Sequence, residues 1–94
     1  MKMESFDNVW EALEDDPAVV ANMTARSDLM IAIEQTVKRW KITQAAAAKR
    51  LGLTQPRLNE LLRGHIDKFS LDALMNIAVA AGLTVRIEVG RKAA

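Results

Sequence analysis

The chain has 94 residues, half of them hydrophobic, and a formal net charge of +1, which predicts one folded domain over residues 1–94. It contains no cysteine, which excludes disulfides and thiolate metal sites. No apolar run is long enough to cross a membrane and the N-terminus lacks the pattern of a secretory signal, so we expect a cytoplasmic protein without membrane partners.

The charges are distributed unevenly along the chain. Residues 1–28 carry two basic and seven acidic side chains, a net charge of −5, whereas residues 29–68 carry eight basic and three acidic ones, a net charge of +5. Residues 69–94 have a net charge of +1. A basic middle segment favours a polyanion as partner; an ordinary solvated surface is the alternative.

The N-terminal part, residues 1–26, is predicted to be an acidic helical extension. It includes a short helix over residues 8–13, with Asp7 as its N-cap.

A long helix is predicted to begin at Pro17, after Asp16. Aspartate accepts hydrogen bonds from the free N–H groups of a helix start, and proline at the first helical position loses none. Apolar residues then recur every three or four positions over residues 17–40, except that Arg26 occupies one apolar position. One continuous helix is the preferred interpretation, and a break near residues 24–27 is the alternative.

Three further helices are predicted from their end signals. Each begins after a serine or threonine, whose side chain can cap the helix, and each ends at a glycine. The first helix is predicted over residues 44–51, between the N-cap Thr43 and Gly52. The second is predicted over residues 55–63, between Thr54 and Gly64. The third is predicted over residues 71–81, between Ser70 and Gly82.

Residues 83–89 alternate between apolar and polar side chains, which predicts a β-strand. A lone strand cannot satisfy its backbone polar groups, so we expect it to pair with the same strand of a second copy in a homodimer. Val85, Ile87 and Val89 are the predicted dimer contacts. Pairing with the sheet edge of a different protein is the alternative. Residues 90–94 are predicted to be a tail.

The segment 44–63 is typical of two short helices joined by a tight turn. Ala48 is small enough for the helices to cross closely, and Gly52 makes the turn. The side chains predicted to point inward are Leu51, Leu53, Leu58 and Leu61. This arrangement indicates a helix-turn-helix, which places its second helix in the major groove of double-stranded DNA.

The outward side chains of this unit are candidates for DNA contact. Gln55, Arg57 and Asn59 are predicted to contact base edges, because glutamine and asparagine suit adenine and arginine suits guanine. The start of the first helix can hold a phosphate. The residues predicted to contact the DNA backbone are Thr43, Gln44, Lys49, Arg50, Thr54, Arg63 and Lys68.

The segment from Thr43-Gln44-Ala45 through Leu53-Thr54-Gln55 to Arg63-Gly64 resembles the helix-turn-helix of Xre/Cro/cI-type repressors. The matched positions are Gln44, Ala48, Gly52, Leu53, Leu58, Leu61 and the pair Thr54-Gln55. The resemblance implies an all-α, lambda-repressor-like bundle, here of about five helices, with the core over residues 27–82 and the single C-terminal strand added. Pro56 departs from the family pattern, because it offers no base-contacting side chain at a position that often contacts bases. Base contact is therefore expected from Gln55, Arg57 and Asn59.

A second resemblance covers more of the chain. Thr54-Gln55-Pro56-Arg57-Leu58 and the stretch from Leu62-Arg63-Gly64 to Ala73-Leu74 are similar to small single-domain HigA-type antitoxins and free-standing regulators. This resemblance implies transcriptional repression of an operon and, in a toxin–antitoxin system, binding of a ribonuclease toxin. With the predicted strand it suggests a homodimer on a palindromic operator, with recognition helices roughly 34 Å apart.

The alternative function is a protein-binding module that neutralises a partner protein, with DNA binding secondary or absent. The acidic cluster Glu11, Glu14, Asp15 and Asp16 could bind a basic toxin. No enzyme is expected, since the chain has a single histidine, His65, and no glycine-rich phosphate loop. No cofactor or metal is expected for the same reason.

Overall fold

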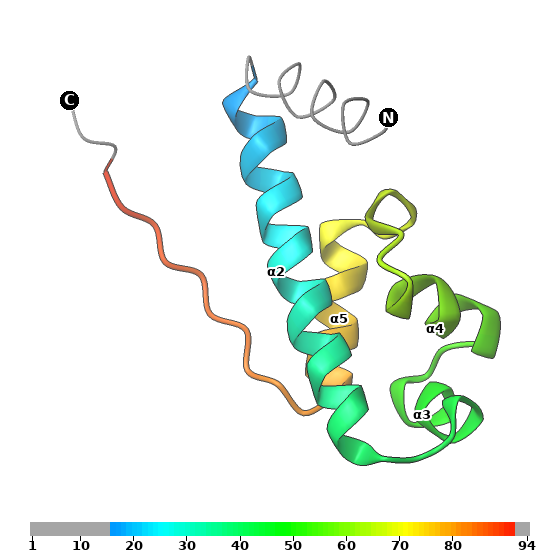
Figure 1. The fold of residues 1–94 in the computed structure, drawn as a ribbon. Helices are drawn as coiled ribbons and strands as arrows, with labels where there is room; N and C mark the ends of the chain where they lie inside the picture. Colours follow the sequence, from blue (N-terminus) through cyan, green and yellow to red (C-terminus); the bar gives the residue numbers. More distant parts are fainter. Residues whose placement is uncertain (1–15, 92–94) are drawn as a thin grey trace.

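A computed structural model describes residues 16–91 of the chain (Figure 1). Within this range the chain forms four α-helices and one short 3-10 helix. The elements are α2 (Pro17–Trp40), α3 (Gln44–Leu51), α4 (Gln55–Leu62), η1 (Ile66–Lys68) and α5 (Leu71–Ala80). This arrangement confirms the predicted helical bundle. The predicted helix over residues 8–13 lies outside the described residues, so four of the five expected helices are described here.

Helix α2 is continuous from Pro17 to Trp40, which confirms the preferred interpretation of this segment. Its start is capped as expected, since the side chain of Asp16 accepts hydrogen bonds from the N–H groups of Ala18 and Val19. No helix in residues 16–91 is long and apolar enough to span a membrane.

Arg26, which occupies an apolar position of the α2 pattern, has a structural role. Its guanidinium donates hydrogen bonds to the carbonyl oxygens of Ile66, at 3.3 Å, and Phe69, at 3.1 Å. These bonds satisfy backbone acceptors in the loop between α4 and α5 and connect that loop to α2. The arginine therefore continues the packing face of α2 by a polar contact.

The three later helices begin at the predicted caps. The hydroxyl oxygens of Thr43, Thr54 and Ser70 each accept a hydrogen bond from the N–H group three residues on. At the end of α3, Gly52 has a φ of +73°, and the Leu53 N–H donates to the Ala48 carbonyl oxygen at 2.8 Å. The Gly52 N–H donates to the Ala48 and Lys49 carbonyl oxygens as well, so these bonds together close the last turn of α3.

The core lies where α2 and α5 meet the pair α3 and α4. Its buried side chains come from every α-helix and from the loop before α5: Met30, Ile33, Val37, Ala47, Ala48, Leu51, Leu58, Leu61, Phe69, Leu74, Ile77 and Ala78. Leu53 and Trp40 are partly buried against this core, as the sequence predicts. Trp10, the other tryptophan, lies outside the described residues.

The predicted β-strand over residues 83–89 is wrong for the isolated chain. Residues 83–91, called the C-terminal segment below, run as an extended chain away from α5 (Figure 1). Among residues 16–91 no strand is formed, and no backbone hydrogen bond involves the stretch from Thr84 to Arg91. The physical reason is that a strand requires a partner strand for its N–H and C=O groups, and residues 16–91 of a single copy supply none.

Candidate nucleic-acid interface

Helices α3 and α4, with the residues that cap them, form a bihelical unit over residues 43–64. Ala47 and Ala48 of α3 are both buried, and their small side chains let neighbouring helices approach closely. The unit lies on one side of α2, and the C-terminal segment lies on the other (Figure 1). The outer surfaces of α3 and α4 are therefore open to a large partner without interference from that segment.

The start of α3 has the properties of an anion site. Thr43 accepts a hydrogen bond from the Ala46 N–H at 3.1 Å, and the Ala47 N–H donates to the Thr43 carbonyl oxygen. The N–H groups of Gln44 and Ala45 have no acceptor within the helix, because the first turn of an α-helix lacks preceding carbonyls. Gln44 is exposed, so these donors can meet a phosphate oxygen together with the helix dipole.

The start of α4 presents its side chains differently. Thr54 accepts a hydrogen bond from the Arg57 N–H at 3.2 Å, and Pro56 has no N–H to offer. Gln55, the first helical residue, is exposed, whereas Asn59 one turn later is partly buried. Since Pro56 also carries no polar side chain, the exposed amide of Gln55 is the most accessible base-contact candidate on this turn.

Arg57, the third predicted base contact, is bound within the chain. Its guanidinium lies over the Phe69 ring, 3.9 Å from the centroid, and donates to the Lys68 carbonyl oxygen at 2.9 Å. The Glu60 carboxylate lies 3.6 Å from the same guanidinium nitrogen. The Arg57 side chain is 38% exposed, so these contacts hold it at the surface beside α4, and it must leave them to reach a base.

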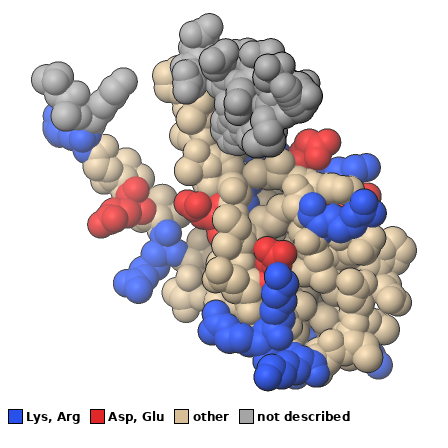
Figure 2. All heavy atoms as spheres, viewed as in Figure 1, with Lys and Arg blue, Asp and Glu red and all other residues tan. Residues whose placement is uncertain are grey.

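The predicted backbone-contact residues are exposed and surround α3 and α4. Lys49, Arg50, Arg63 and Lys68 are all exposed at the surface. The Arg50 guanidinium lies 4.4 Å from the centroid of the Trp40 ring, which holds it near the end of α2. Lys68 is 3.5 Å from the Glu60 carboxylate. Figure 2 shows this mixture of basic and acidic side chains over α4 and the loop that follows it.

Sequence reasoning missed a second group of basic residues at the end of α2. Lys38 and Arg39 lie in its last turn, and Lys41 follows with an exposed side chain and a left-handed backbone. Basic side chains gather there at the lower end of the molecule in Figure 2. The count of charges over residues 29–68 included them, but they were not assigned to the DNA contacts.

The predicted dimer contacts do not join this site. Val85 is partly buried against the core, and Ile87 and Val89 are exposed on the C-terminal segment. Within residues 16–91 no three or more acidic or histidine side chains cluster in a way that could hold a metal ion. The groups that the fold collects around α3 and α4 are thus helix N-termini, amides and cations.

Comparisons with known proteins agree with this geometry. A family model described as a helix-turn-helix domain matches residues 12–90. A solved structure named as an XRE family transcriptional regulator is 31% identical in sequence, with a TM-score of 0.70. The match covers 76% of this chain and 80% of that chain. None of the curated proteins compared matches this chain.

Proposed function

Because this chain belongs to the Xre-type helix-turn-helix family, we propose that it is a sequence-specific DNA-binding transcriptional regulator. The observation that carries the proposal is the start of α4, where Gln55 is exposed on a helix fixed by buried Leu58 and Leu61. In this mode the second helix of the unit enters the major groove and its N-terminal side chains contact base edges.

Base contact is assigned to three residues of α4. Gln55 and Asn59 can each pair with the N6 and N7 groups of adenine, and Arg57 can pair with the O6 and N7 groups of guanine. Arg57 would first exchange its stacking on Phe69 for the base. Because a guanidinium bound to guanine gains two parallel hydrogen bonds, such an exchange is feasible in the groove.

Phosphate contact is assigned to the surrounding donors and cations. The free N–H groups and the amide of Gln44 suit one phosphate at the α3 start, and the hydroxyls of Thr43 and Thr54 can donate while their oxygens accept from the helix. The further backbone contacts proposed are Lys41, Lys49, Arg50, Arg63 and Lys68. These residues position the unit on the duplex without selecting sequence.

The chain is proposed to act as a repressor that binds a palindromic operator as a homodimer. A two-fold dimer matches the symmetry of such a site and places two α4 helices about one DNA turn apart, roughly 34 Å. The unpaired C-terminal segment supports this proposal, because it supplies a surface for a second copy on the side of α2 away from the bihelical unit.

A second candidate function is that of an antitoxin, which also binds a toxin protein. The net charge of −5 over residues 1–28 favours it, since a basic ribonuclease toxin would be attracted to this part of the chain. The neighbouring reading frame tests this candidate. A small basic ribonuclease-like product would support it, and a neighbour of another class would oppose it.

Variants of the base-contact residue test the main proposal. A duplex enriched from random sequence by the protein, and a scrambled duplex of equal length, are titrated with the wild-type and Gln55→Ala chains. The Gln55→Ala change is expected to cost about 1–3 kcal/mol of binding free energy on the enriched duplex and little on the scrambled one. Asn22→Ala, an exposed amide at the opposite end of α2 from α3, is the matched control. Equal losses on both duplexes would remove base contact by Gln55.

The salt dependence of binding tests the phosphate contacts separately. Replacing Lys49 by alanine is expected to weaken binding equally on both duplexes. Because the proposed dimer loses one phosphate contact from each copy, the slope of log K against log salt should fall by about 2. An unchanged slope would show that Lys49 lies away from the DNA backbone.

A further inference from the structure

The C-terminal segment carries features that the DNA site does not use. Its backbone is extended, and Ile87 and Val89 are 75% and 87% exposed. Side chains alternate along it as in a strand, with one apolar row and one polar row. The apolar row is Leu83, Val85, Ile87 and Val89, and the polar row is Thr84, Arg86 and Glu88.

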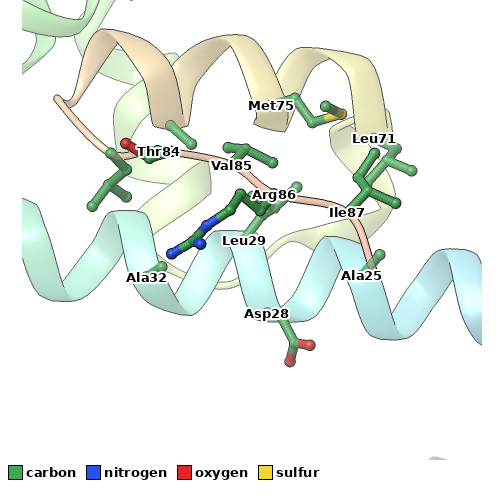
Figure 3. Close-up of a pocket in the computed structure, with 12 residues that line it drawn as sticks. Ala25, Asp28, Leu29, Ala32, Leu71, Met75, Thr84, Val85, Arg86 and Ile87 are labelled. Carbon is green, nitrogen blue, oxygen red and sulfur yellow. The ribbon is translucent and has the colours of Figure 1, made fainter. Parts of the chain in front are cut away.

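Residues 83–87 of the segment form one wall of a groove whose other walls come from α2 and α5. Figure 3 shows Val85 and Ile87 between α2 and α5, with Ile87 beside Leu71 and Val85 near Met75. The groove has a volume of about 440 Å³ and includes Leu29 of α2. The body of the chain thus packs against Leu83 and Val85 of the apolar row and leaves Ile87 and Val89 exposed. A two-stranded ribbon needs such packing to be stable in water.

We propose that the C-terminal segment pairs antiparallel with the same segment of a second copy, in the register that places Ile87 opposite Ile87 on the two-fold axis. This inference rests on the homodimer of the proposed function and adds the register of its interface. In this register Arg86 lies opposite Glu88 of the second copy, and the same pair recurs across the axis. Val85 lies opposite Val89, also twice.

Charge selects this register from its neighbours. A slip of one residue would set polar side chains opposite apolar ones and turn the apolar row away from the groove. A slip of two residues in one direction places Arg86 opposite Arg86, and in the other direction Glu88 opposite Glu88. Like charges directly opposite each other are destabilising, whereas opposite charges stabilise. All three registers place apolar residues opposite apolar residues on or next to the axis, so the charged pairs distinguish them.

The second copy also extends the apolar cover of the groove. Val89 of the second copy lies opposite Val85, which lines the groove itself, so it adds an apolar side chain at the edge. In the same step the N–H and C=O groups on the inner edge of the segment, which belong to every other residue, gain partners across the ribbon. Figure 2 shows basic and acidic side chains along the segment, exposed to a partner.

Charge exchange tests the register. Arg86→Glu and Glu88→Arg each place like charges opposite each other twice per dimer, so each variant is expected to raise the dimer dissociation constant about tenfold, measured by sedimentation equilibrium. Mixing the two variants is expected to restore dimers, because every glutamate then faces an arginine. The double exchange in one chain is expected to restore them too. In either neighbouring register neither single variant adds a like-charge pair, because the pair on the axis stays alike in charge and the other residue faces Thr84 or Gly90. A dimer that is insensitive to both variants would therefore overturn the register.

Disulfide trapping gives an independent test, since the chain has no cysteine. Ile87→Cys places two thiols directly opposite, with Cα atoms about 5 Å apart, within the range of a disulfide. Arg86→Cys is the matched control, because its two copies lie diagonally about 7–8 Å apart. Cross-linked dimers from Ile87→Cys with few from Arg86→Cys are expected, and the reverse would overturn the register.

The outcomes separate this inference from the function on which it rests. A wild-type chain that is monomeric in sedimentation, or whose segment pairs only with another protein, would remove both the homodimer and the register. A wild-type dimer that is insensitive to both charge variants would remove the register and leave the homodimer and DNA binding standing.

Discussion

The bihelical unit and the C-terminal segment lie on opposite sides of α2, and they differ in how far one chain completes them. The unit has its caps, its turn and its buried leucines within 22 residues of sequence, and Thr43 and Thr54 each accept one N–H of a helix start. The segment has an apolar row and extended backbone but no hydrogen-bonded partner among the described residues. The comparison teaches that contacts within one chain complete the unit, whereas the segment lacks a hydrogen-bonded partner strand in the part of the chain that the structure describes.

The largest expected difference between the two regions is in core packing. Leu58 of α4 is fully buried, so Leu58→Ala is expected to lower the free energy of unfolding by about 2–5 kcal/mol. Val89→Ala removes an 87% exposed side chain and should change the stability of the monomer by less than about 0.5 kcal/mol. Urea unfolding followed by circular dichroism at low protein concentration measures both. Similar losses for the two variants would contradict the comparison.

A glycine in each region gives the next test. Gly52 has a φ of +73° and no heavy atom near an added Cβ, so Gly52→Ala has only a backbone cost, about 1–2 kcal/mol. Gly90→Ala, also with nothing near its Cβ and without a left-handed backbone, is the matched control and should leave unfolding unchanged. A free energy of unfolding that is unchanged by Gly52→Ala would show that the turn between α3 and α4 does not depend on the left-handed backbone of residue 52.

The smallest effect is expected from a helix cap. Thr54→Ala removes the acceptor of the Arg57 N–H and should cost about 1 kcal/mol of stability, while Thr54→Ser keeps the hydroxyl and should cost less. Thr84→Ala in the C-terminal segment removes an exposed hydroxyl and serves as the control. Thermal unfolding of the three variants measures these losses of stability. A loss for Thr54→Ser equal to that for Thr54→Ala would show that the Thr54 hydroxyl does not stabilise the start of α4.

The sequence predicts the bihelical unit well because its determinants are local. Caps act over three residues, a terminal glycine acts on the preceding turn, and leucine spacing follows the helical period. Thr54 and Gly52 could therefore be assigned without the fold. The start of α2 at Asp16 and its continuity to Trp40 follow from the same rules.

The remaining features depend on contacts distant in sequence or on another chain. Arg26 bonds to carbonyls 40 and 43 residues away, and Arg57 to one 11 residues away. The hydrophobic periodicity of a sequence does not predict such contacts. The predicted strand is wrong for a related reason. Alternation of apolar and polar side chains identifies an extended segment, but a hydrogen-bonded β-ladder also requires a second segment beside it.

Selection of DNA by the intact chain tests the central claim most directly. The wild-type protein is incubated with a pool of random duplexes, and the bound fraction is sequenced after several rounds. The account predicts an enriched inverted repeat whose half-site centres lie about 10–10.5 base pairs apart, one for each α4 helix of the dimer. A pool that stays random after selection would contradict it.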